Sequence, residues 1–242
     1  MRLIIIRHAD PDYSIDSLTE TGWQEAEILS DRISRLDVKA FYTSPLGRAK
    51  DTAKATLAKM GREAEVCDWL REFPVSLKEK NGTKQSDCAW DWLPELWTEI
   101  PEFYDKDKWL DVPCMQEAEA RTVYEAVTVG LDSLLAKHGY ERCGNYYKAV
   151  SPNEDTLVFF CHFGLECVLL SHLIGASPMV LWHGFCAAPT SVTTVYTEER
   201  REGKASFRIA SFGDVSHLYA AGRAPSFAAR FCETYHSDER HD

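Results

Sequence analysis

The stretch Met1-Arg-Leu-Ile-Ile-Ile-Arg-His-Ala-Asp10 opens the chain and organises the fold that the sequence predicts. Residues 3–6 are apolar and mostly β-branched, which is typical of a strand buried on both faces of a sheet. The apolar run stops at Arg7 and His8, and such groups are costly to bury without partners. Ligand sites of open α/β sheets lie at the carboxyl ends of the strands. We therefore expect Arg7 and His8 to meet other functional groups at that edge.

The composition indicates a globular protein with a sizeable core. The 242 residues are 45% hydrophobic and 27% charged, and we expect a single domain over 1–242. The net charge is -11 and no stretch is rich in Lys or Arg, which argues against a nucleic-acid partner. No run of about 18 apolar residues predicts a membrane span. Arg7 interrupts the first apolar stretch too early for a signal peptide, so we expect a cytoplasmic protein.

The cysteines and histidines do not have the spacing of a metal site. Without an export signal, the eight cysteines are expected to be free thiols in a reducing compartment. No two cysteines have CxxC spacing, which argues against structural zinc. No histidine pair has HExxH spacing. We therefore expect neither a metal nor another cofactor.

Strands and helices alternate in the first part of the chain. The expected elements are a helix at about 21–36, a strand at 40–43, a helix from 44 to about 60 and a short strand at 65–68. Either Thr19 or Thr21 caps the first helix. Ser44 is the expected cap of the second, with Pro45 at its first position. Arg48 then lies in the first turn, just past a strand end, and the alternation indicates parallel pairing with right-handed crossovers.

Aromatic and proline residues set the middle of the chain apart. We interpret about 73–115 as an insertion with short helices that forms a cap, because linkers are not rich in tryptophan. Its four tryptophans are Trp90, Trp92, Trp97 and Trp109. They form either a lid or pocket wall, or a small satellite core, and the sequence leaves both possibilities open.

The last part of the chain contains a second buried strand. The expected elements are a helix at 116–138, a loop at 139–154, a strand at 156–161, a helix from 164 to about 174, an antiparallel hairpin of 191–197 with 206–212, and a flexible tail at about 226–242. The strand at 156–161 ends on His162. The sequence thus predicts an α/β three-layer sandwich, with a central mostly parallel sheet flanked by helices and an inserted helical cap.

The predicted strand ends offer a phosphate site. Arg7 with His8, Arg48 and His162 converge on one crevice if the strands are parallel. These cations repel each other unless an anion lies between them, and the planar fork of arginine suits a tetrahedral oxyanion. A neutral imidazole in such a pocket can attack phosphorus. The leaving alkoxide then needs a proton, which a nearby carboxylic acid can give.

Several motifs in the same order resemble the histidine phosphatase (phosphoglycerate mutase-like) superfamily. They are Arg7-His-Ala9, Leu18-Thr-Glu-Thr-Gly-Trp-Gln-Glu-Ala26, Ser44-Pro-Leu-Gly-Arg-Ala49 with Thr52-Ala53, and Phe160-Cys-His-Phe-Gly164. The family's counterparts are Arg-His-Gly, Leu-Thr-x-x-Gly-x-x-Gln-Ala, Ser-x-Leu-x-Arg-Ala-x-x-Thr-Ala and Ser-His-Gly. Ala9 and Phe163 stand where the family has glycine, and Phe163 is expected to narrow the pocket.

The resemblance implies a role for each matched residue. His8 is the implied nucleophile, and Arg7, Arg48 and His162 are the implied ligands of the transferred phosphoryl group. Glu72, in a Leu-x-Glu context after the third strand, is the implied proton donor. The insertion supplies the rival glutamates Glu79, Glu95 and Glu99.

Three functions follow from the resemblance. The first is a metal-independent phosphatase that hydrolyses a small phosphomonoester through phosphohistidine on His8. The second is phosphoglycerate mutase-like phosphoryl transfer, ranked lower because the polar Ser-x-Trp-Asn stretch of that branch is absent after His8. The third is a non-catalytic module that binds a phospho-ligand or a protein. The matched histidines and arginines argue against the third, because a module without chemistry does not need a nucleophile.

Overall fold

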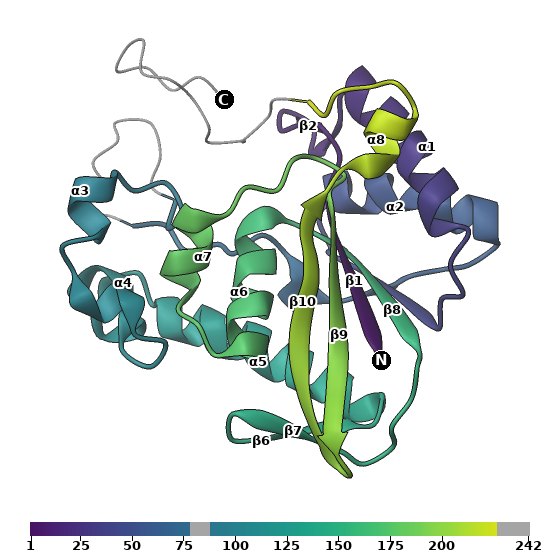
Figure 1. Cartoon of the computed structure of the whole chain (residues 1–242). Helices are drawn as coiled ribbons and strands as arrows, with labels where there is room; N and C mark the ends of the chain where they lie inside the picture. The colour runs from purple at the N-terminus through teal and green to yellow at the C-terminus, as the bar shows by residue number, and fades with distance from the viewer. Residues whose placement is uncertain (78–87, 227–242) are drawn as a thin grey trace.

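An eight-stranded sheet forms the centre of the molecule in the computed structural model, which describes residues 1–77 and 88–226 (Figure 1). The strand order is β5-β4-β8-β1-β9-β10-β7-β6. The strands are β1 (Arg2–Arg7), β4 (Ala40–Thr43), β5 (Glu65–Val66), β6 (Tyr140–Cys143), β7 (Tyr146–Ala149), β8 (Thr156–Cys161), β9 (Val192–Arg201) and β10 (Lys204–Asp214). Two short strands, β2 (Pro11–Asp12) and β3 (Ser17–Leu18), pair with each other outside this sheet.

The sheet is parallel in the half that holds β1. β5, β4, β8 and β1 pair in parallel, whereas β1 with β9 and every later pair are antiparallel. The antiparallel half begins with the expected hairpin, whose two strands are longer than predicted. The predicted α/β fold with helices on both faces of the sheet is confirmed.

The two faces of the sheet are covered by different helices. The helices are α1 (Glu20–Ile33), α2 (Gly47–Met60), α3 (Pro94–Trp97), α4 (Pro113–Glu117), α5 (Ala120–Lys137), α6 (Phe163–Ile174), α7 (Pro178–Gly184) and α8 (Ser216–Ala220). Figure 1 shows α1, α2 and α8 on one side of the sheet and α5 and α6 on the other. None of the helices among the described residues is long and apolar enough to span a membrane.

β1 is buried on both faces, as its apolar run predicts. Leu3 and Ile5 belong to the core on the α5–α6 side, and Ile4 and Ile6 belong to the core on the α1–α2 side. Removing each of these side chains from water contributes roughly 1.5–3 kcal/mol. This alternation fixes the register of β1, since a slip by one residue would exchange the two faces. It therefore also fixes where Arg7 ends the strand.

The helix starts differ in one place from the prediction. Thr19 caps α1, because its hydroxyl accepts the backbone N–H of Gly22 at 3.0 Å. The second helix begins at Gly47, and Ser44 is not its cap. The Ser44 hydroxyl instead accepts the N–H of Leu46 within a turn. The first N–H of α2 is accepted by the carboxylate of Asp16, a residue distant in sequence that a local pattern does not reveal.

One further expectation is confirmed in part and another is wrong. The helix predicted at 116–138 occurs as α5 but begins at Ala120, because Glu119 has a φ of 52° and separates α5 from α4. The loop predicted at 139–154 contains the β6–β7 hairpin. Its strands have four residues each and expose polar side chains, so their apolar pattern is too short to read, although Tyr140 and Tyr147 are fully buried.

The described part of the insertion packs on the main core. It contains α3, α4 and the 3₁₀ turns Pro101–Tyr104 and Trp109–Asp111, and the turn Asp68–Leu70 precedes it. Trp109 is fully buried and meets Trp182 of α7 edge-on at 5.7 Å between ring centroids. The tryptophans therefore extend the core around α5 and α6 and do not form a separate satellite. Residues 78–87, with Glu79, and 227–242, most of the predicted tail, lie outside the described residues.

Candidate active site

The carboxyl ends of β4, β8 and β1 bring the predicted strand-end residues together. Arg7 pairs with Cys161 in the parallel ladder, so His8 and His162 follow at neighbouring positions. Their ring centroids are 5.2 Å apart. The backbone N–H groups of His8 and Ser44 both bond to carbonyls of β8, at 2.9 Å each. Main-chain pairing on both sides of β8 therefore fixes the spacing of the site.

A hydrogen bond of His8 defines which of its ring nitrogens carries the proton. The ring is 2% exposed, and Nδ1 lies 2.8 Å from the carbonyl oxygen of Ala9. A carbonyl oxygen only accepts, so Nδ1 carries the proton and Nε2 keeps its lone pair. Burial, together with the charge of Arg7 and then Arg48, holds the pKa of His8 well below its usual range. His8 is therefore neutral at physiological pH.

His162 is fully buried beside Ser44. Its Nε2 lies 2.8 Å from the Ser44 hydroxyl, and Nδ1 is buried with no hydrogen-bond partner among the described residues. Burial is the largest cause that holds the pKa of His162 well below its ordinary value, followed by the charge of His8. A Ser44 hydroxyl that donates to Nε2 leaves Nδ1–H as a donor for an oxyanion.

Each arginine of the site is held by an acceptor away from the imidazoles. Arg7 is buried and donates through Nη1 to the carbonyl of Ala187, in the segment between α7 and β9. Arg48, in the first turn of α2, donates through Nη1 to Oδ1 of Asp16 at 2.7 Å. The ring of Tyr13 stands 5.4 Å from the Arg48 guanidinium carbon. Both guanidinium groups are thus oriented by the loops that surround the strand ends.

Asp16 is a site residue that the sequence analysis missed. One of its oxygens accepts from Arg48, and the other accepts the N–H of Gly47 at 2.7 Å. These hydrogen bonds and the Arg48 charge outweigh the effect of burial, the largest single cause, and lower the pKa of Asp16. A side chain at Gly47 would clash, since its Cβ would lie 2.0 Å from the Asp16 carbonyl oxygen. In the sequence, the glycine before Arg48 was the sign that another segment packs closely against the start of α2.

Glu72 lies at the amino end of α6, which begins directly after His162. Its Oε1 accepts the N–H groups of Phe73 at 2.9 Å and Leu165 at 3.0 Å. Burial raises the pKa of Glu72, while those two N–H groups, Arg48 and Arg7 oppose the rise. Because Oε1 is occupied as an acceptor, the proton of the acid form belongs on Oε2.

The packing of Trp90 and Glu72 against α6 requires a glycine at position 164. A Cβ on Gly164 would lie 2.6 Å from the Trp90 ring and 2.9 Å from Glu72 Oε1. Trp90 of the insertion therefore closes against the first turn of α6, and Phe163 is buried in the same core. Of the rival donors that the structure describes, Glu95 and Glu99 are exposed on the α3 segment, and only Glu72 is placed at the strand ends.

Glu166, one turn into α6, is a second charged group that the sequence analysis did not single out. It is fully buried, and burial raises its pKa to about 8, with Thr193 and Arg7 opposing the rise. The carboxyl is therefore largely protonated at neutral pH. Its position inside an otherwise apolar helix, four residues after His162, was the available signal.

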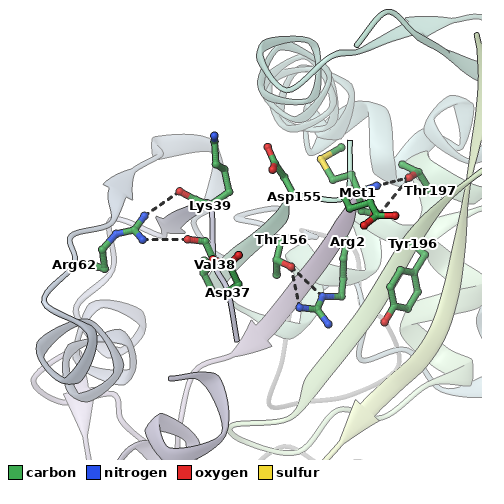
Figure 2. Close-up of a pocket in the computed structure, with 11 residues that line it drawn as sticks. Met1, Arg2, Asp37, Val38, Lys39, Arg62, Asp155, Thr156, Tyr196 and Thr197 are labelled. Atoms are coloured by element: carbon green, nitrogen blue, oxygen red, sulfur yellow. Dashed lines mark hydrogen bonds between the residues drawn. The ribbon is translucent and has the colours of Figure 1, made fainter. Parts of the chain in front are cut away.

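A separate hollow of about 940 Å³ lies at the opposite edge of the sheet, around the amino end of β1 (Figure 2). Its side chains carry both signs of charge. Arg2 bonds to the Thr156 hydroxyl, and Arg62 bonds to the carbonyls of Val38 and Lys39. These interactions hold the two guanidinium groups against the protein. The hollow contains none of the strand-end residues described above.

A sequence profile of a known family matches most of the chain. Residues 3–209 match the sequence profile of the histidine phosphatase superfamily (branch 1). The 2,3-bisphosphoglycerate-dependent phosphoglycerate mutase of Thermoplasma acidophilum is 29% identical over 94 residues, 35% of this chain and 46% of that protein. The match thus spans about half the length of this relative.

Solved structures share the fold. A mutant phosphoserine phosphatase from Entamoeba histolytica with phosphoserine has a TM-score of 0.60 at 19% identity, covering 90% of this chain and 98% of that one. A mycobacterial glucosyl-3-phosphoglycerate phosphatase with inorganic phosphate has a TM-score of 0.60 at 16% identity, covering 90% and 99%. At these identities the likeness extends to the fold alone.

Proposed function

This chain belongs to the histidine phosphatase superfamily, and we propose that it is a metal-independent phosphatase that hydrolyses a small phosphomonoester through phosphohistidine on His8. The observation that carries the proposal is the hydrogen bond from His8 Nδ1 to the Ala9 carbonyl. This bond directs the lone pair of Nε2 away from the backbone. Relatives with phosphatase and mutase names support phosphoryl transfer as the chemistry.

The proposed binding step places the phosphate between cations and neutral imidazoles. Arg7 and Arg48 supply fixed positive charge at any relevant pH. His162 donates through Nδ1–H to a phosphoryl oxygen, with its ring held by Ser44. The amino end of the twelve-residue helix α6 adds partial positive charge at the same place. These groups offset the charge that develops on the equatorial oxygens during transfer.

In the first chemical step, Nε2 of His8 attacks phosphorus. The bond from phosphorus to the ester oxygen breaks, and its electron pair leaves with that oxygen. Glu72 gives its Oε2 proton to the leaving oxygen, so a neutral alcohol departs. The raised pKa of Glu72 keeps more of this acid protonated than an exposed glutamate would be.

In the second step, the Glu72 carboxylate takes a proton from water. The water oxygen attacks the phosphohistidine, and the electron pair of the broken P–N bond returns to Nε2 of His8. Inorganic phosphate is released, and both residues regain their starting forms. A mutase would instead return the phosphoryl group to a substrate hydroxyl, a reaction that the name of the curated relative makes the second candidate.

A phosphatase assay on an aryl phosphate, with EDTA present, tests the proposal. We expect turnover by the wild type to be insensitive to EDTA and to fall about 10³-fold or more in His8→Ala, since the nucleophile is removed. His138→Ala is the matched control, because His138 caps the carboxyl end of α5 and its ring bonds to Tyr42, not to a residue of the site. Equal rates for wild type and His8→Ala would contradict the mechanism.

A second arm separates phosphatase from mutase. The protein is incubated with 3-phosphoglycerate, and the products are followed by phosphorus NMR. Free phosphate as the main product supports hydrolysis, whereas an isomerised phosphoglycerate without release of phosphate would support the mutase. Inhibition of the aryl phosphatase activity by EDTA would contradict the metal-independent mechanism.

A further inference from the structure

Two strongly exposed apolar side chains lie on the loop that flanks the phosphate crevice. Tyr13 is 65% exposed and Ile15 is 69% exposed, between β2 and β3. Ile15 and Tyr13 are the most exposed large apolar residues among the described ranges 1–77 and 88–226. Apolar surface left in water costs roughly 25 cal/mol per Å², so a ligand that covered these two side chains would gain binding energy from them.

This loop is held against the phosphate site. Asp16 bonds both Arg48 and the first N–H of α2. Asp12 closes the turn by accepting from the backbone N–H of Ser14 at 3.0 Å and from its hydroxyl at 2.5 Å. The Tyr13 ring lies over the Arg48 guanidinium. The apolar side chains therefore stand beside a group that binds the phosphate in the proposed function.

The segment that accepts a hydrogen bond from Arg7 also carries an exposed aromatic residue. Phe185 is 44% exposed and packs against Phe212 of β10, with 4.8 Å between ring centroids. It precedes by two residues Ala187, whose carbonyl accepts from Arg7. One arginine thus lies against the Tyr13 ring, and the acceptor of the other lies two residues after the exposed Phe185.

The charges on the same loop disfavour an acidic substrate. Asp12 and Asp16 flank the two exposed side chains, and Asp10 precedes β2. Asp16 is paired with Arg48, so Asp10 and Asp12 are the carboxylates that a charged leaving group would meet, whereas an uncharged apolar group would not meet a like charge. Arg71 precedes Glu72 in the chain and its charge helps to lower the pKa of His162, so it is the cation that a carboxylated substrate would use instead.

We infer that the substrate is a phosphomonoester of an aryl or similarly apolar alcohol, and that Tyr13 and Ile15 cover its leaving group. This inference rests on the proposed function. The apolar loop supplies binding energy remote from the reacting atoms, and Asp16 links it to Arg48. An aryl leaving group also departs readily, because a phenolate is more stable than an alkoxide.

Titration calorimetry with phosphonates tests the inference without turnover, because their P–C bond is not hydrolysed. The probes are methylphosphonate, benzylphosphonate and the acidic phosphonoacetate. We expect benzylphosphonate to bind about tenfold more tightly than methylphosphonate, from the burial of its ring on the loop. Ile15→Ser removes most of this preference and leaves methylphosphonate affinity unchanged. Val129→Ser is the matched control, since Val129 is 63% exposed on α5.

Two results would overturn the inference. One is equal affinity for benzylphosphonate and methylphosphonate in the wild type. The other is tightest binding of phosphonoacetate with loss of that binding in Arg71→Gln, which would assign the substrate to the acidic class. Failure of the proposed function is distinguishable: a benzylphosphonate preference without turnover of phenyl phosphate would contradict hydrolysis and still support the apolar subsite.

Discussion

At the scale of single residues, the chemistry depends on which atom each hydrogen bond occupies. The Ala9 carbonyl occupies Nδ1 of His8, and the N–H groups of Phe73 and Leu165 occupy Oε1 of Glu72. The opposite atoms, Nε2 and Oε2, are therefore the ones available for phosphoryl and proton transfer. The sequence predicted the residue types, but these atoms follow only from the folded backbone.

Replacing the proposed acid should affect esters according to their leaving group. We expect Glu72→Gln to lower kcat/KM for alkyl phosphates by about 10²–10³-fold, because the alkoxide then leaves without a proton. Since the acid must be protonated, wild-type kcat/KM for alkyl esters falls as pH rises through the raised pKa of Glu72. That decline should vanish in Glu72→Gln, as measured by initial rates against pH. Glu95→Gln, an exposed control, should keep the wild-type profile, and a Glu72→Gln enzyme that also kept it would exclude Glu72.

Removing the charge of Asp16 should weaken phosphate binding. We expect Asp16→Asn to raise KM several-fold, with a smaller change in kcat, because a charge-assisted hydrogen bond that orients Arg48 is lost. Vanadate affinity should weaken in parallel. Asp31→Asn is the matched control, since Asp31 forms an ion pair with Lys59 near the carboxyl ends of α1 and α2. An unchanged KM in Asp16→Asn would show that Arg48 needs no such partner.

At the scale of elements, apolar patterns predicted the buried strands and missed a helix cap and a short hairpin. β1 and β8 are unbroken apolar runs, and they were predicted at the positions where they occur. The start of α2 was misplaced because its capping group, Asp16, comes from another loop. The β6–β7 hairpin was missed because its strands are short and partly polar.

The insertion is attached to α7 by a histidine that should respond to pH. Nδ1–H of His183 donates to the Met179 carbonyl at 2.8 Å, and Nε2 accepts the N–H of Trp92 at 3.3 Å. The Trp97 ring stacks on it at 4.7 Å. Burial lowers the pKa of His183, so its neutral form stabilises the fold above the unfolded pKa of about 6.5. This contribution is lost as pH falls through the folded-state pKa.

Hydrogen exchange measures how far the contact between His183 and Trp92 weakens as pH falls. We expect the amide of Trp92 to exchange faster as the pH is lowered below about 6.5, after correction for the intrinsic rate, because protonated Nε2 no longer accepts its N–H. His183→Gln offers an acceptor that does not titrate, so its corrected exchange should be flat with pH. The same pH dependence in both proteins would assign the effect to another group.

At the scale of the whole molecule, the parallel half of the sheet creates the site. The order β4-β8-β1 sets Ser44, His162 and His8 side by side, although they are far apart in sequence. This convergence was predictable, because parallel strands end at one edge. The β9–β10 hairpin was predicted as well. Its antiparallel pairing with β1 and β7 and the hydrogen bonds of Asp16 and Glu72 were not predictable, because they depend on tertiary contacts between distant segments. The surrounding loops add the exposed apolar residues to which we assign the leaving group.

The most direct test is to trap the phosphorylated protein. Glu72→Gln is mixed rapidly with para-nitrophenyl phosphate, whose leaving group needs no acid, so that His8 is phosphorylated while hydrolysis is slowed by the missing base. We predict a burst of about one equivalent of nitrophenol per protein, and a phosphoryl group on the peptide that contains His8, stable in alkali and lost in acid. His8→Ala should show neither. A burst with the phosphoryl group on another residue, or turnover without any phosphorylated protein, would contradict the mechanism.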